Sequence, residues 1–540
     1  MRPLGFDYII VGSGSAGCVL AARLSADPNV TVLLLEAGGT ARRVESVVPA
    51  LYPRLFRSSV DWAYRTEVQD RLNGRRLFWP RGRMVGGSSR MNDMVYIRGN
   101  RADYDRWHTL GNDGWDYRSV LPYFRRSENQ QRGPSEFHGV GGPLDVSDLR
   151  YVHPRTLDFL AAAGATGLDR NDDFNGAEQV GVGLHQVNQL AGRRSSAASG
   201  FLRPALGRTN LTVVTGAHAG RVLFAANRAV GVQWMRHGRL ETATADAEVV
   251  LSGGSVNTPA LLMLSGVGDA TALAAIGIRP RVDLPGVGRN LQDHLMVPVS
   301  WRSAEQSSLL DGKSARSVLS YATRRTGPLA SNLGQAGAFT STGPEAAAPD
   351  TQLVFAPVLL DDVRDDRVVE PTEHGYSIGS VLLQPASRGE VTLSSANPAD
   401  RPVVRPGYLT EPGDLETLVR GVRLALAIGG SQPLAGAARD RHALAGASRG
   451  ELEQFIRANV DTMFHPVGTC AMGTGDDAVV DPDLRVKGLD GLRVVDASVM
   501  PTVTRGNTHA PTTMIAERAA DLLLAAQRAE RQVRTAGVPG

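Results

Sequence analysis

Two short apolar runs near the start of the chain flank a glycine-rich turn, and this arrangement constrains the fold more than any other feature. Residues 6–11 are largely apolar and rich in β-branched side chains, residues 18–24 have the composition of a helix, and residues 30–35 form a second apolar run. Strand, glycine-rich turn, helix and strand make a βαβ unit, which belongs to a parallel sheet. The sequence therefore predicts an α/β protein with a Rossmann-like domain.

The glycines of this turn have separate predicted roles. Gly12 allows a tight turn, Gly14 lets the backbone approach a pyrophosphate, and Gly17 permits close packing of helix on strand. The pyrophosphate would lie at the N-terminus of the helix, and Glu36 would accept hydrogen bonds from a ribose hydroxyl. An incidental glycine-rich turn is the alternative, and the pattern itself does not separate NAD from FAD. The other predicted contacts of this loop are Ser13, Ser15 and Ala16.

A second loop rich in glycine and serine covers residues 82–92, and residues 92–96 after it are predicted to form a helix. Its closely spaced backbone N–H groups suit a phosphate or the edge of a flavin, whereas a plain surface loop is the alternative. The cofactor contacts predicted in this region are Arg83, Gly86, Gly87, Ser88, Asn92, Asp93 and Met94.

Length and composition set broader limits. A chain of 540 residues with 42% hydrophobic and 21% charged residues predicts two globular domains. A net charge of +3 gives no strong attraction to nucleic acid or anionic lipid, and we find no apolar run long enough for a membrane span. The two cysteines favour a reducing compartment, and a first strand that starts near residue 6 leaves no room for a signal peptide. We therefore expect a cytoplasmic protein.

Several segments resemble the signatures of the glucose–methanol–choline (GMC) oxidoreductases. Residues 80–89 (PRGRMVGGSS) resemble the first signature of this family, and residues 254–268 resemble the second. Further similarity lies in residues 103–107, 284–294, 465–469 and 495–512, in the order expected for the family. The resemblance implies FAD rather than a nicotinamide cofactor. Some members attach FAD covalently through a histidine at the position of Met91, so non-covalent FAD is implied here.

The resemblance also implies a discontinuous FAD-binding domain. We assign residues 1–155, 190–300 and 456–540 to this domain, and residues 156–189 and 301–455 to a second, α+β substrate-binding domain. Asp496 is implied to contact the ribityl or pyrophosphate region, although a simple turn at a strand end is the alternative. The remaining implied contacts to FAD are Ala219, Ala497, Ala510, Pro511 and Thr512.

Two histidines are the predicted catalytic residues. Oxidation of an alcohol needs a base for the hydroxyl proton, and histidine has the side chain whose ordinary pKa lies nearest neutral pH. The resemblance identifies His465 as this base and His509 as its partner, which would hold the substrate oxygen and stabilise an alkoxide-like transition state while hydride passes to flavin N5. A plain neighbour of the N-cap of a final helix, at residues 510–528, is the alternative for His509.

Asp93 departs from the family pattern, which has a small residue at this position. One interpretation pairs its carboxylate with Arg90 on a helix face, and the other makes Asp93 a recognition group for a substrate amine or hydroxyl. Phe464 is predicted to wall the substrate pocket. Together with Trp62, Tyr64 and Trp79 it favours an aromatic or other planar alcohol, and a core role for these residues is the alternative.

These features predict an FAD-dependent oxidoreductase that converts a primary alcohol, aromatic or otherwise planar, to the aldehyde. The electron acceptor is O2 or a quinone-like molecule, between which the sequence does not distinguish. A non-redox flavin lyase of the hydroxynitrile-lyase type is the alternative on the same scaffold. Retention of both His465 and His509 argues against a protein that binds FAD without catalysis. We predict no metal site.

Overall fold

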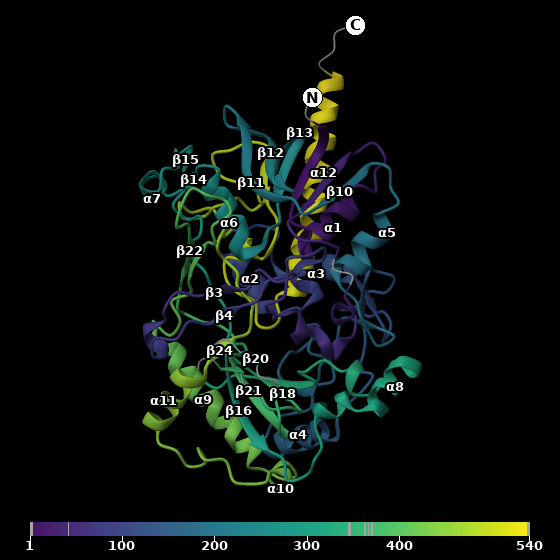
Figure 1. Cartoon of the computed structure of the whole chain (residues 1–540), viewed down its shortest axis with the longest axis vertical. Coiled ribbons are helices and arrows are strands. Elements are labelled where there is room, and N and C mark those ends of the chain that lie inside the picture. Colours follow the sequence, from purple (N-terminus) through teal and green to yellow (C-terminus); the bar gives the residue numbers. More distant parts are fainter. Residues whose placement is uncertain are drawn as a thin grey trace.

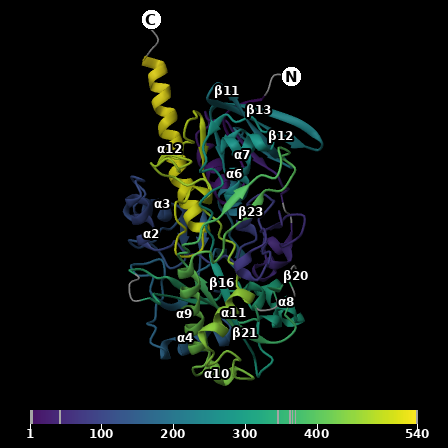
Figure 2. The same cartoon turned by 90° about the vertical axis from the view of Figure 1, so that its left-hand side faces the viewer.

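The computed structural model describes residues 4–40, 43–343, 347–360, 363–364, 367–368 and 371–536. Two large sheets lie at opposite ends of the molecule, with the N- and C-terminal segments together at one end (Figure 1). The turned view shows the long C-terminal helix α12 running along the end of the molecule that holds the N- and C-terminal segments (Figure 2). The predicted α/β class with a Rossmann-like domain is confirmed.

The first sheet contains the predicted βαβ unit. Strand β1 pairs in parallel with β2 on one side and β13 on the other, and β2 and β13 pair in parallel with β10 and β25. Strands β11 and β12 continue the sheet as antiparallel neighbours of β13. Its strands are β1 (Leu4–Val11), β2 (Val32–Glu36), β10 (Leu211–Thr215), β11 (His218–Ala225), β12 (Arg228–Arg236), β13 (Arg239–Leu251) and β25 (Leu492–Val494).

Helices from both ends of the chain pack together beside this sheet. Helix α1 (Ser15–Leu24) has eight buried residues, and it packs on α12 (His509–Ala536). The ion pair between Arg23 and the fully buried Glu517, at 2.7 Å, joins the two helices. The final helix of the chain is thereby fixed against the first βαβ unit.

The second sheet is antiparallel throughout. Its strand order is β24 (Asp461–Thr462), β16 (Leu295–Arg302), β21 (Gly375–Leu382), β18 (Thr351–Ala356), β17 (Ala336–Thr340) and β7 (Gly181–Leu184). Helices α4 (Pro154–Ala165), α9 (Pro412–Gly429) and α11 (Arg449–Asn459) lie beside this sheet at the far end of the molecule (Figure 1). Helix α9 lies so close to β21 that a Cβ atom on Gly421 would be 2.1 Å from the Ser380 Oγ.

Two strands lie in this second sheet although the sequence places them with the FAD-binding segments. Strand β16 starts at Leu295 and pairs with β21 over eight residues, and β24 pairs with β16. Residues 295–300 and strand β24 thus join the second sheet although they fall within segments expected for the FAD-binding domain, and the domain boundaries themselves stay a prediction. The partners of these strands are distant in sequence, so local patterns do not indicate which sheet they join.

The smaller elements connect these two units. The remaining helices are α2 (Arg101–Thr109), α3 (Tyr117–Ser127), α5 (Arg203–Ala205), α6 (Gly254–Leu264), α7 (Ala270–Ala275), α8 (Ala315–Arg324) and α10 (Leu434–Ala437). The remaining strands are β3 (Tyr64–Arg65), β4 (Phe78–Trp79), β5 (Glu128–Gln130), β6 (Leu144–Val146), β8 (Gln189–Leu190), β9 (Arg193–Arg194), β14 (Val267–Gly268), β15 (Val282–Asp283), β19 (Val363–Arg364), β20 (Arg367–Val368), β22 (Glu390–Thr392) and β23 (Val403–Arg405). None of the helices in the described ranges combines the length and hydrophobicity that crossing a membrane requires.

The helix predicted at residues 92–96 is wrong. The loop instead forms a short 3-10 helix at Gly87–Arg90, after which Val95 bridges to Val187. The Asn92 side chain accepts the N–H of Met94, and Met94 takes a positive φ of 62°. This side-chain turn competes with helical hydrogen bonding and returns the chain to an extended path.

Candidate active site

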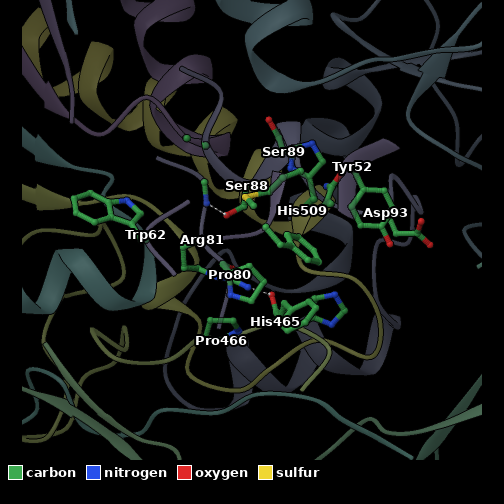
Figure 3. Close-up of a pocket in the computed structure, with 18 of the residues that line it drawn as sticks. Tyr52, Trp62, Pro80, Arg81, Ser88, Ser89, Asp93, His465, Pro466 and His509 are labelled. Carbon is green, nitrogen blue, oxygen red and sulfur yellow. Dashed lines mark hydrogen bonds between the residues drawn. The ribbon is translucent and has the colours of Figure 1, made fainter. Parts of the chain in front are cut away.

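A large cavity of about 1260 Å³ lies between the two sheets. Both glycine-rich loops, the start of α12 and one face of the second sheet line it. Figure 3 shows His465, His509 and Asp93 around this cavity, with Ser88 and Ser89 of the second loop beside them.

The glycines of the first loop form a cradle that fits a dinucleotide. Gly12 has a φ of +101°, and a Cβ on it would lie 2.4 Å from the Ser252 carbonyl oxygen. A Cβ on Gly17 would lie 1.8 Å from the Gly12 carbonyl oxygen. A Cβ on Gly14 would meet no atom within 4 Å, because Gly14 faces the cavity. The open backbone at Gly14, at the N-terminus of α1, is where a pyrophosphate would bind.

Most of the predicted site residues line this one cavity. Besides His465, His509 and Phe464, those that do are Gly12, Gly14, Ser15, Ala16, Glu36, Gly87, Ser88, Asn92, Asp93, Met94, Ala219, Asp496, Ala497 and Thr512. The predicted residues that lie behind the lining are Ser13, Gly17, Arg83, Gly86, Ala510 and Pro511. Segments separated by up to about 500 residues are thus brought together.

Two buried carboxylates hold the frame of the cofactor cavity. Glu36 accepts hydrogen bonds from the backbone N–H groups of Ser13 and Gly38 and from the Ser13 hydroxyl. Asp496 accepts hydrogen bonds from Gly254 N–H and the Thr258 hydroxyl, both at the start of α6. Each carboxylate therefore fixes a loop of the cradle, whatever further contact it makes with the cofactor.

The hydrogen bonds around His465 determine which of its ring nitrogens carries the proton. His294 Nε2 lies 3.1 Å from the Leu383 carbonyl oxygen, which can only accept, so this nitrogen carries a hydrogen. Burial lowers the pKa of His294 to about 4, so the ring is neutral and its Nδ1 is an acceptor. His465 Nδ1, 3.0 Å away, must therefore donate to it. The lone pair of neutral His465 is consequently on Nε2.

The rest of the surroundings hold His465 in its neutral form. Burial, followed by the influence of His294 and Arg81, holds the pKa of His465 well below its ordinary value. The Asp293 carboxylate lies close in the structure but accepts the backbone N–H of His465 at 2.7 Å rather than a ring N–H. The imidazole at this position is therefore an uncharged proton acceptor at neutral pH.

Asn507, rather than His509, contacts the His465 ring. The Asn507 Nδ2 lies 3.2 Å from His465 Nε2, and its Oδ1 is buried with no partner in the described part of the chain. His509 Nδ1 is 2.9 Å from the Ser15 hydroxyl of α1, and its Nε2 is likewise buried and unpartnered among the described residues. The cavity thus presents an imidazole acceptor together with unsatisfied polar atoms on Asn507 and His509.

The interpretation that pairs Asp93 with Arg90 is wrong. Arg90 donates to the Thr40 carbonyl and the Ser46 hydroxyl. Asp93 instead accepts the backbone N–H groups of Leu333 and Gly334, both at 2.8 Å. Because residues 92–96 are not helical, the spacing of three does not put Arg90 and Asp93 on one face. Asp93 anchors a loop of the second domain beside the cavity.

The aromatic residues expected at the pocket have different positions. Phe464 lines the cavity and packs edge-on against Phe56 at 5.9 Å. Trp62 and Tyr64 stack on each other at 5.9 Å and also line it. Trp79 is fully buried in the second core, so the core alternative holds for this residue.

Sequence reasoning did not single out His294, Asn507 or Asp293 as site residues. His294 and Asp293 end the segment 284–294, and Asn507 lies two residues before His509 inside segment 495–512. The available signal was the presence of a polar side chain in each of these segments. What makes these three residues part of the site is their contact with His465, which lies 42–172 positions away in the sequence.

Comparisons with known proteins agree with this geometry. A family model described as GMC oxidoreductase matches residues 6–296, and a second model with the same description matches residues 385–516. Among curated relatives, "Alcohol dehydrogenase [acceptor]" of Pseudomonas putida is 43% identical over 532 residues, which cover 96% of each chain. The mitochondrial choline dehydrogenase of Homo sapiens is 42% identical over 535 residues, covering 96% of this chain and 89% of the relative.

A solved structure has the same fold over nearly the whole chain. Pyridoxine 4-oxidase from Mesorbium loti is 35% identical with a TM-score of 0.87, and the match covers 96% of this chain and 98% of that one. Both sheets and the cavity between them are included in an overlap of this extent.

Proposed function

Because the chain belongs to the GMC oxidoreductase family, as an FAD-dependent enzyme that acts on CH–OH donors, we propose that it oxidises a primary alcohol to the aldehyde with His465 as general base. The observation that carries this proposal is the hydrogen-bonded pair of His294 and His465, which leaves the lone pair of His465 on the Nε2 atom beside Asn507. A base at this point suits removal of a hydroxyl proton.

The cavity residues fit FAD in the following way. The backbone at Gly14 and Ser15 would hold the pyrophosphate of FAD. The second loop, at Gly87 and Ser88, would contact FAD from the opposite side of the cavity, and the start of α12 would complete the site. FAD, when bound, would supply the acceptor for the hydride that leaves the alcohol carbon, which carries both electrons of the oxidation. With Met91 at the position of possible attachment, we propose that it is held non-covalently.

The side chains around the base have complementary roles in this proposal. His465 takes the hydroxyl proton at Nε2 while its Nδ1–H stays hydrogen-bonded to His294. If the Ser15 hydroxyl donates to His509 Nδ1, then His509 Nε2 carries a hydrogen that can be donated to the substrate oxygen. This hydrogen on His509 Nε2 would then stabilise the negative charge that develops on the substrate oxygen in a water-poor cavity. Asn507, whose Nδ2 lies beside His465 Nε2, would help to position that ring.

The proposed substrate is a planar or aromatic primary alcohol, since Phe464 and Phe56 form an aromatic wall of the cavity. The named relatives include both dehydrogenases and an oxidase, so the proposed acceptor is O2 or a quinone-like molecule. Both cysteines of the described structure are unpaired and buried, in keeping with a proposed cytoplasmic location.

The test is flavin reduction by a panel of primary alcohols without oxygen. Bleaching of the flavin band by an alcohol supports the proposal, and admission of air with detection of peroxide then separates oxidase from dehydrogenase activity. Cleavage of a cyanohydrin without bleaching would support the lyase alternative and overturn the oxidation.

The pH dependence of the alcohol reaction should follow the lowered pKa of His465. A histidine with a depressed pKa remains an unprotonated base as the pH falls through 6.5, and it becomes protonated only in more acidic solution. We expect kcat/KM to stay level from neutral pH down past pH 6.5 and to fall only below that. A profile with its acidic limb at about pH 6.5, the ordinary histidine value, would contradict the expected environment of His465.

Replacement of His294 by leucine should slow alcohol oxidation even though His294 is a positioning residue. Without an acceptor for the Nδ1–H, His465 has no preference for the tautomer with its lone pair on Nε2. We expect a loss of about 10- to 100-fold in the rate of flavin reduction, in the range of other orienting partners. Because the side-chain oxygen of an asparagine can accept the same N–H, His294→Asn should restore part of the rate, whereas equal losses in both variants would point to a structural effect.

A further inference from the structure

The floor of the cavity is one face of the second sheet, and the strand register defines its rows. Gln352 of β18 lies opposite Val381 of β21, which lies opposite Met296 of β16. The next row consists of Val354, Gly379 and Pro298 in the same order. Because neighbouring side chains along a strand alternate between faces, these residues share a face, and Gln352, Val354, Met296 and Pro298 all line the cavity.

Gln352 is a polar residue that this apolar floor does not satisfy. Its side chain is 2% exposed and lines the cavity, yet its amide makes no hydrogen bond to any residue that the structure describes. Buried amides are normally hydrogen-bonded, because an unmade bond costs free energy. A partner from outside the chain would satisfy it.

His185 provides a second polar atom without a partner in the part of the chain that the structure describes, beside the row of the floor next to that of Gln352. Its Nδ1 lies 2.8 Å from the Gly334 carbonyl oxygen and so carries the hydrogen, which makes Nε2 an acceptor. This Nε2 is buried without a partner among the described residues, at a distance of 2.5 Å from where a Cβ on Gly337 would be. Gly337 pairs with Val354, the cavity-lining residue two positions after Gln352.

Gln352 lies close along the sheet to the backbone carbonyl that orients His294, the partner of His465. His294 is hydrogen-bonded to the carbonyl of Leu383, and Val381, the cross-strand partner of Gln352, is two residues before Leu383. Two residues of a strand span about 7 Å. Because His465 and Gln352 line the same cavity, an alcohol with its CH–OH group at His465 can extend its far end toward the row that contains Gln352.

We propose that Gln352 and His185 form a second polar subsite, which binds a hydroxyl group at the end of the substrate opposite the carbon that is oxidised. The ligand hydroxyl donates to His185 Nε2 and accepts from the Gln352 amide. The inference rests on the proposed alcohol oxidation and assigns its substrate class, neutral alcohols that carry a second hydroxyl group. Apolar alcohols leave both groups unsatisfied. The carboxylate of Asp461, a residue that pairs with Met296 at the other end of the same row and lines the cavity, is the group that would favour a cationic alcohol instead.

The experiment compares 1,4-benzenedimethanol with 4-methylbenzyl alcohol on the FAD-loaded wild type and on Gln352→Met. The two alcohols have the same ring and the same reacting group, and they differ in the distal hydroxyl. We expect Gln352→Met to lower kcat/KM for flavin reduction by the diol about 10- to 100-fold and to change the value for the methyl compound by less than about 3-fold. Equal changes for both alcohols would overturn the subsite.

Ser380→Ala is the matched control. Ser380 belongs to the same sheet and has a buried hydroxyl without a partner in the described ranges, but it faces helix α9 instead of the cavity. Its replacement should leave the preference for the diol unchanged, and a change equal to that of Gln352→Met would indicate a general effect on the sheet and overturn the assignment.

Measuring how tightly the two alcohols bind distinguishes failure of the proposed subsite from failure of the proposed alcohol oxidation. If neither alcohol bleaches the flavin, the oxidation of these alcohols fails, and the subsite is then judged from their dissociation constants, measured by perturbation of the flavin spectrum. A Kd for the diol that rises about 10-fold in Gln352→Met supports the subsite, and an unchanged Kd overturns it. A preference for choline over both alcohols that survives Gln352→Met would also overturn it and would instead implicate the cavity carboxylate of Asp461.

Discussion

Replacement of His465 by alanine is expected to slow flavin reduction by a primary alcohol about 10²- to 10⁴-fold, the range for loss of a general base. The expectation follows from the position of its Nε2 lone pair, which the His294 contact fixes beside Asn507. The measurement is the rate of anaerobic bleaching in a stopped-flow instrument, under conditions in which alcohol binding is saturated. The backbone of residue 465 remains held by Asp293 in the variant, so the cavity should keep its shape.

Two controls assign this loss to the missing base. The FAD content and the rate of reduction by dithionite should match those of the wild type, because neither depends on removal of a hydroxyl proton. Added imidazole should restore part of the rate by entering the space that the side chain vacated. A variant that reduces with alcohol at the wild-type rate would show that His465 is not the base.

The first βαβ unit was predictable because its signals are local. The apolar runs, the glycines at positions 12, 14 and 17 and the acidic residue Glu36 lie within 36 residues, and each has a backbone or packing requirement of its own. Gly12 requires a positive φ, and Gly17 leaves no room for a Cβ. Such requirements restrict the residue type at a position whatever the rest of the chain does.

The second sheet was harder to predict because strand pairing is not local. Residues 295–302 have a β-like pattern that fits either sheet, and their partner strand starts at Gly375, far along the chain. All six residues of β18 are buried, so no alternation showed which side chains face the cavity. Gln352 could nevertheless have been noticed in the sequence, because a polar side chain within a buried apolar strand normally needs a hydrogen-bond partner.

The hydrogen bonds around His465 were also not predictable from local sequence patterns. His465 was identified through resemblance, but the proton position on its ring depends on His294 and on the backbone carbonyl of Leu383. A carbonyl oxygen has no signature in the sequence. The Asp93 pairing failed for a related reason, because a spacing of three residues has meaning only within a helix, and the Asn92 turn prevents one.

Replacement of Gly14 by leucine is expected to yield a folded protein that retains much less FAD than the wild type and loses alcohol oxidation in proportion. Gly14 has a φ of −73°, which any residue can adopt, so the substitution causes no backbone strain. A Cβ there meets no protein atom within 4 Å, so the leucine side chain projects into the cavity and occupies the space of the pyrophosphate. Extra methylenes in a filled site cost about 1–3 kcal/mol, which corresponds to roughly 5- to 150-fold weaker binding.

The ratio of flavin to protein absorbance after gel filtration measures this loss, and thermal unfolding of the apoprotein shows whether the chain is folded. Gly164→Leu is the matched control, because Gly164 lies on the exposed side of α4 and a Cβ there also meets no atom within 4 Å. This control should keep its full FAD content. Gly14→Ala should retain more FAD than Gly14→Leu, because a methyl group fills less of the cavity. If Gly14→Leu retained FAD at the wild-type ratio, the pyrophosphate could not lie against Gly14, and the glycine-rich turn would be a feature of the fold alone.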